Sequence, residues 1–159
     1  MAKMKTLGFA LILAVTLLGC RSVNGPDPVA MIQYDNVPIV TKSGKTLSLR
    51  EVRQVITDSA TEAGWKVVDS QTGPVVGTYE YKNKHFATVK IDYTPQSFSI
   101  VYESSKNLKY RISDQYESYE PVQTGAAKRY PKGTPLIHGV YNKWLETLVK
   151  KIQTGFLSK

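Results

Sequence analysis

Cysteine is nearly absent from the sequence, since Cys20 is the only one among 159 residues. No disulfide can therefore form within the chain, and a lone cysteine needs an explanation, such as reaction with another molecule. Histidine is almost as rare, and His85 and His138 lie on different predicted elements. A zinc site needs three or four ligands in tetrahedral geometry, and no spacing in the sequence proposes one. We expect neither a metal nor a cofactor.

The common catalytic signatures are also missing. The sequence has no G-x-S-x-G, no H-E-x-x-H and no glycine-rich phosphate-binding loop. No nucleophile beside a base and no pair of carboxylates stands out. The protein is therefore not expected to be an enzyme, and hydrolysis is the least favoured activity.

The longest apolar run is short. It extends from Leu7 to Leu18 and has twelve residues, whereas a helix that spans a bilayer needs about 20. It follows Lys3 and Lys5, and this pattern is typical of a cleavable signal peptide. The run ends in the sequence L-L-G-C at residues 17–20, which resembles the lipobox of bacterial lipoproteins.

The lipobox resemblance implies that residues 1–19 are removed as a signal peptide and that Cys20 carries a diacylglyceryl thioether. It also implies a further acyl chain, such as palmitate, on the new amino terminus, so that lipid ties the protein to a membrane. In Gram-negative lipoproteins an aspartate after the cysteine tends to retain the protein in the inner membrane, and Arg21 stands there instead. We expect anchoring in the bacterial cell envelope, at the outer membrane, with the domain facing the periplasm or the cell surface. The alternative is an ordinary signal peptide followed by a chance cysteine.

Acidic residues are too few to balance the basic ones. The formal net charge is +8, and removal of residues 1–19 would lower it to +6. Basic surfaces favour anionic lipid headgroups, cell-wall polymers or nucleic acid. Export makes nucleic acid the least favoured, so we expect no nucleic-acid partner. Alternatively, the charge only keeps a small domain soluble.

Residues 20–36 have little apolar periodicity and contain Asn24, Gly25, Pro26 and Pro28. This composition is typical of a flexible tether. Residues 37–159 are then a single domain, because a chain of this length is hardly sufficient for two.

The domain opens with a helix predicted over residues 49–63. Ser48 and Glu51 have the spacing of a capping box, the next residues place apolar side chains on one helical face, and Gly64 suits a left-handed C-terminal cap. A final amphipathic helix is predicted from Ile137 to Ile152, with regular structure ending at Gly155.

Between the helices the hydrophobic period changes to two. Four extended segments are predicted at 65–68, 75–81, 85–93 and 97–103. Their short connections require antiparallel pairing, because parallel neighbours need a longer crossover. The sequence therefore predicts an α+β fold in the order α-β-β-β-β-α, an antiparallel meander of three to four strands with both helices on its apolar face.

Residues 111–135 lack clear periodicity and are predicted to form a long loop, which is unusual in a compact domain. Within it Lys128, Arg129 and Lys132 surround Tyr130 and form a candidate basic patch. Such a patch could contact anionic lipid or glycan. The alternative is a solvated loop.

The segments Asn107–Tyr110 and Ile137–Trp144 carry a second resemblance. Together with the predicted helix and meander, the patterns N-L-x-Y and I-H-x-x-Y-N-x-W-x-x-x-L resemble a family of small uncharacterised envelope lipoproteins. The likeness covers roughly residues 46–110 and 136–152 and has no established activity attached to it. Residues 111–135 are longer than the family's usual connection.

The same two segments supply the candidate binding residues, Tyr110, His138, Tyr141 and Asn142. His138 and Asn142 are four apart on one helix face, with Tyr141 beside them and Tyr110 approaching from the sheet. Such groups could hold a small ligand at a sheet–helix edge. The alternative is structural, with His138 at the helix start, Asn142 bonded to backbone and Tyr141 in the core.

The function expected from the sequence is non-catalytic binding or scaffolding at the cell envelope, with the membrane and another envelope protein as partners. The alternative is a binder of a small ligand or a cell-wall glycan, with its pocket near Tyr110, His138 and Asn142.

Overall fold

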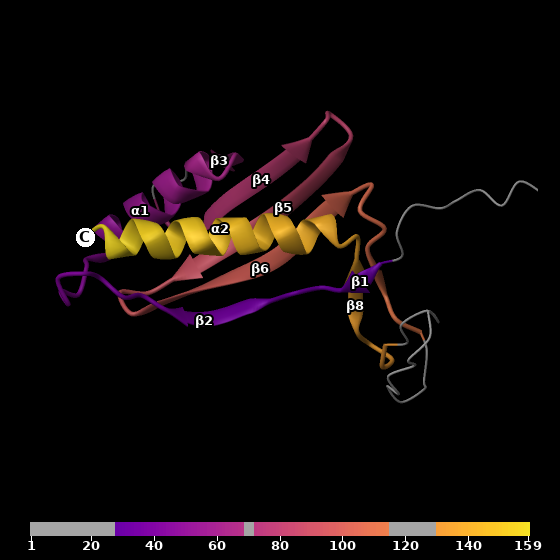
Figure 1. Ribbon diagram of the computed structural model, residues 1–159, viewed down its shortest axis with the longest axis horizontal. Helices are drawn as coiled ribbons and strands as arrows, with labels where there is room; N and C mark the ends of the chain where they lie inside the picture. Colours follow the sequence, from indigo (N-terminus) through magenta and orange to yellow (C-terminus); the bar gives the residue numbers. More distant parts are fainter. Residues whose placement is uncertain (1–27, 69–71, 115–129) are drawn as a thin grey trace, which may run out of the picture.

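The computed structural model describes residues 28–68, 72–114 and 130–159, in which the chain forms two helices and eight strands (Figure 1). The expected α+β class is confirmed: all strand pairs are antiparallel, in one five-stranded and one three-stranded sheet. In chain order the elements are β1 (Val29–Ala30), β2 (Tyr34–Pro38), α1 (Leu49–Glu62), β3 (Trp65–Val68), β4 (Val75–Tyr81), β5 (His85–Tyr93), β6 (Ser97–Lys106), β7 (Arg111–Ile112), β8 (Pro135–Ile137) and α2 (Val140–Leu157).

The predicted meander is confirmed as β3 to β6, and β2 adds one strand at its edge in the order β2-β6-β5-β4-β3. Both helices cover one face of this sheet (Figure 1). Aromatic rings join α2 to the strands, with Trp144 4.6 Å from Tyr79 and Phe156 6.2 Å from Phe98 between ring centroids. The core lies in this layer between sheet and helices.

The start of α1 follows the predicted capping box. The Ser48 backbone N–H donates to the Glu51 carboxylate at 2.8 Å, and the Glu51 N–H donates to Ser48 Oγ at 3.3 Å. Hydrogen bonds from the Ser48 backbone and then from its hydroxyl lower the pKa of Glu51. The helix ends just before Gly64, whose φ of 86° is the left-handed conformation expected of a glycine cap.

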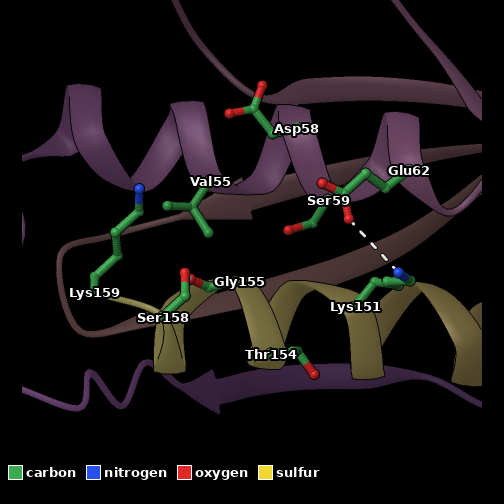
Figure 2. A pocket seen from close by; sticks show the side chains of 9 residues that line it. All are labelled: Val55, Asp58, Ser59, Glu62, Lys151, Thr154, Gly155, Ser158 and Lys159. Carbon is green, nitrogen blue, oxygen red and sulfur yellow. Dashed lines mark hydrogen bonds and ion pairs between the residues drawn. The ribbon is translucent and has the colours of Figure 1, made fainter.

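Gly155 was expected to end the last helix, and this prediction is wrong because α2 continues to Leu157. Gly155 faces α1 in Figure 2. A Cβ added there would lie 2.5 Å from Ser59 Oγ and 3.0 Å from Val55 Cγ1. The glycine therefore permits a close approach of the two helices rather than a turn.

The predicted tether is too long. Val29 and Ala30 pair with Ile137 and Leu136 of β8, and β2 pairs with β6. Residues from 28 onward therefore belong to the folded domain. The predicted leader, Cys20 and the tether up to residue 27 lie outside the described residues.

The predicted loop at 111–135 is also too long at both ends. Arg111 and Ile112 pair with Leu136 and Pro135, so that β8 lies between β1 and β7 in the smaller sheet. Residues 115–129 lie outside the described part of the chain.

Candidate functional site

Asn142, on the first turn of α2, holds the N-terminal strand in place. Its Nδ2 donates to the Ala30 carbonyl at 2.9 Å, and its Oδ1 accepts from the Ile32 N–H at 3.1 Å. The amide therefore bonds, through donor and acceptor, to backbone more than a hundred residues earlier in the sequence. Both of its functional groups already have partners within the chain.

His138 lies just before α2, and the prediction that this helix begins at Ile137 is wrong because Ile137 pairs with Val29 as the last residue of β8. Its backbone N–H donates to the Leu108 carbonyl at 2.8 Å, and its Nδ1 accepts from the Val140 N–H at 3.2 Å. The ring thus satisfies one of the amides that a helix start leaves unpaired, which the N-cap residue Gly139 cannot do. Burial, followed by the charges of Lys109 and His85, lowers the pKa of His138. The neutral ring is the form that accepts this bond.

The two tyrosines differ in exposure. Tyr141 is buried, which raises the pKa of its phenol. Tyr110 is 41% exposed and stacks on Tyr102 at 4.5 Å between centroids. Tyr102 in turn meets Tyr141 edge-on at 5.9 Å. One aromatic column therefore runs from the core to the surface, and Tyr110 is its outer end.

The structure thus brings the four candidates to one end of α2 but not around one open site. Tyr141 and Asn142 have the structural roles that were the alternative reading, and His138 bonds to backbone at the helix start. Tyr110, in contrast, lines a hollow at the surface.

That hollow, the junction hollow, has a volume of about 390 Å³ and lies where the two sheets meet. It is lined by Met31, Gln33, Tyr34, Asp35, Ser99, Ile100, Val101, Tyr102, Tyr110, Ile112, Gly133 and Pro135. Val101 and Ile112 are 44% and 52% exposed, so its rim presents apolar surface to solvent. Sequence reasoning missed this hollow because the lining residues in 31–35 were assigned to the tether and those in 112–135 to the long loop.

An open strand edge borders the junction hollow. β2 pairs with β6 only from Ser97 to Ile100, and within the described residues no strand pairs with that side of β6 beyond Ile100. The polar floor is internally bonded: Ser99 Oγ donates to Asp35 at 2.9 Å and accepts from the Asn36 N–H at 2.9 Å. An apolar rim, a stacked tyrosine and an open edge suit binding of another molecule.

A second hollow, of about 300 Å³, lies between the helices (Figure 2). Lys151 and Glu62 form an ion pair across it at 3.6 Å. Both side chains are about half exposed or more, and pairs of this kind contribute little to stability. In the described part of the chain, no group of three or more histidine, cysteine or carboxylate side chains is placed to hold a metal ion.

The basic patch predicted in the long loop can be placed only in part. Lys132 is exposed, next to Tyr130 and the turn at Gly133. Lys128 and Arg129 lie outside the described residues, so the patch stays a prediction.

The fold and its hollows thus define an α+β domain with two helices on one face of a meander. No protein-family model, no curated protein and no solved structure matches the chain. The likeness to small envelope lipoproteins stays a prediction. Neither helix in the described ranges combines the length and apolarity needed to cross a bilayer.

Proposed function

We propose that the protein is a cell-envelope lipoprotein, held on a membrane by acyl chains on Cys20, whose domain has a non-catalytic binding or scaffolding role. The observation that carries this proposal is the sequence of residues 1–20, in which a basic start is followed by a twelve-residue apolar run whose last two leucines begin L-L-G-C. The lone cysteine supports it, because lipidation consumes the sulfur that would otherwise be a free thiol. Two or more acyl chains hold a protein stably on a bilayer, whereas one chain binds reversibly.

The binding role is supported by the junction hollow. Its open β6 edge offers backbone hydrogen bonds to an extended segment of a partner protein, and the apolar rim offers contact area for that segment's side chains. Backbone pairing and apolar contact are sufficient for a scaffold to hold a partner protein, and neither requires a catalytic group.

A second candidate function is binding of a small ligand or cell-wall glycan in the same hollow. The observation that favours it is the Tyr110 ring, which is exposed at the end of an aromatic column fixed from beneath by Tyr102. A held aromatic face beside Gln33 provides stacking and a polar contact. Asn142 and His138 are left out of this version of the site, because they bond to the backbone.

The anchor is tested by the intact mass of the protein purified from cell membranes. A diacylglyceryl group on Cys20 and the absence of residues 1–19 are expected, and a Cys20→Ser variant should lose the lipid and leave the membrane fraction. An unmodified thiol or a retained leader would refute the proposal. In-cell cross-linking from a photoreactive group at Ile112 should then capture one envelope protein. Tyr110→Ala should instead abolish binding of cell-wall fragments if the glycan alternative holds.

A further inference from the structure

Three exposed lysines gather at one end of the molecule. Lys82 and Lys84 flank Asn83 in the turn between β4 and β5, and Lys106 ends β6, where it pairs with Phe86. The Asn107 side chain donates to the Lys84 carbonyl at 2.6 Å, which brings the turn and the end of β6 together. Lys82, Lys84 and Lys106 are called the basic end below.

No ion pair among the described residues offsets the charge of the basic end. Within the described residues no carboxylate lies in ion-pair range of the three ammonium groups, whereas nearby Glu80 is paired with Lys66 at 2.8 Å. Glu103 is the acidic residue closest along β6. Positive potential therefore dominates this end of the sheet.

Aromatic rings accompany these lysines. Lys82 Nζ lies 5.2 Å from the centre of the Tyr81 ring, and Lys106 Nζ lies 5.9 Å from that of Phe86. Tyr81 is 43% exposed. The amphipathic Tyr81 ring next to a lysine suits the headgroup level of a bilayer, where tyrosine is enriched and lysine meets anionic lipid.

The described chain begins at the same end. Val29 pairs with Ile137, the next residue His138 donates its N–H to Leu108, and Leu108 adjoins the Asn107 that bonds the turn. In Figure 1, β1 and the β4–β5 turn both lie at the end away from the C-terminus. The eight steps along the chain from Cys20 to Pro28 can span at most about 28 Å.

Charge alone would not single out this end, because Lys42 and Lys45 flank another exposed turn. That turn is joined to the opposite end of the sheet through the Ile39 N–H, which donates to Gln96. The nine residues of β5 separate the two ends by about 30 Å. The chain from Cys20 enters the domain at the basic end, so this end can rest on the bilayer while that chain is relaxed. The far turn would reach the bilayer only if the chain were stretched along the whole sheet.

We propose that the basic end docks on the anionic lipid surface beside the anchor, so that the domain stands on the membrane in one orientation. This rests on the proposed function, because it requires lipid on Cys20. The open edge of β6 runs from beyond Ile100 to Lys106 of the basic end, so docking holds this edge and the adjoining junction hollow at a fixed place close to the bilayer surface.

The test uses the mature lipoprotein reconstituted in vesicles of phosphatidylcholine, with or without phosphatidylglycerol. Lipidation leaves no other thiol, so Asn83→Cys can carry a single fluorescent probe. Ser43→Cys carries it in the matched turn at the far end. Circular dichroism verifies that each variant is folded. With phosphatidylglycerol, the probe at 83 should be shielded from an aqueous quencher and the probe at 43 should not.

Two charge variants complete the design. Lys82→Gln with Lys84→Gln should lower the ratio of docked to free forms by about twenty-five-fold, because each lysine near an anionic surface contributes about fivefold. Lys42→Gln with Lys45→Gln removes the same charge and should leave the ratio unchanged. High salt should weaken docking.

Equal quenching at 83 and 43, shielding that persists without phosphatidylglycerol, or indifference to Lys82 and Lys84 would each overturn the docking. In those cases a lipidated Cys20, established by mass, leaves the proposed function standing. An unmodified Cys20 would refute both, and the mass measurement reports it separately.

Discussion

Removal of the Asn142 side chain should show how firmly the N-terminal strand is held. Asn142→Ala deletes two hydrogen bonds, those to the Ala30 carbonyl and the Ile32 N–H. Each bond contributes about 1 kcal/mol net at a half-buried site, so the free energy of unfolding should fall by about 2 kcal/mol. The backbone groups left behind are partly reached by water, which keeps the loss from being larger.

The measurement is urea unfolding followed by tryptophan fluorescence, because Trp65 and Trp144 are both buried in the core. Gln153→Ala, an exposed position on the same helix, is the matched control and should change stability by no more than about 0.5 kcal/mol. Hydrogen exchange should also show faster exchange at Val29 and Ala30 in the Asn142 variant. If Asn142→Ala lowers the free energy of unfolding no more than the control does, the two hydrogen bonds of Asn142 do not hold the N-terminal strand.

Asn142→Asp sharpens the test. The carboxylate keeps an acceptor for Ile32 but faces the Ala30 carbonyl oxygen, so the folded state raises the pKa of the new side chain. Protonation restores a donor. The variant should therefore be closer to wild type at acidic pH than at neutral pH, and a pH-independent difference would argue against a bond to Ala30.

Three further predictions concern the helices and the imidazole. Gly155→Ala should lower the free energy of unfolding in urea by about 1–2 kcal/mol, although alanine has the better helix propensity. Ser59→Ala added to this variant should recover part of the loss, because it removes the hydroxyl nearest the new methyl group. A Gly155→Ala variant more stable than wild type would contradict the close helix packing. Ser48→Ala should lower the free energy of unfolding by about 1 kcal/mol. The fold lowers the pKa of Glu51, so the stabilisation from its carboxylate should be present above the unfolded pKa and should vanish as pH falls through the folded pKa. Wild type and Glu51→Gln should therefore converge in acid unfolding curves. The fold also lowers the pKa of His138, so its contribution to stability should be complete above its ordinary pKa and should decline as pH falls from there through the pKa of the folded state. When the free energy of unfolding is measured across pH, His138→Asn should lack this decline.

The sequence predicted the elements whose signals are local. The capping box at Ser48 and the helical spacing after it set α1, and alternation along 75–103 set the meander. Amphipathic helices and half-buried strands can be identified from a few residues, because burial of one face imposes a regular spacing of apolar residues.

The elements that were missed depend on distant partners. Val29 and Ala30 form a strand only because Leu136 and Ile137 lie alongside, and a two-residue strand carries no period of its own. Neighbouring prolines favoured a tether instead. Arg111 and Ile112 were missed for the same reason.

The candidate site was predicted less well than the fold. Helical spacing put His138 and Asn142 on one helix face, but only Asn142 lies in α2, and spacing does not say whether a polar group faces solvent or backbone. The deciding partners of Asn142 come from the segment at 30–32, which had been assigned to the tether. Tyr110 was identified, whereas its support, Tyr102, was read only as a strand residue.

β1 is also where a mechanical load would enter the domain. A pull at residue 28 acts on a two-residue strand, held by its pairing with β8 and by one amide side chain. The five-stranded sheet lies farther along the chain, beginning at Tyr34. Tension from the envelope should therefore detach β1 from β8 first. The segment that links the domain to its anchor would then lengthen by a few residues, while the core beneath α1 and α2 stays folded.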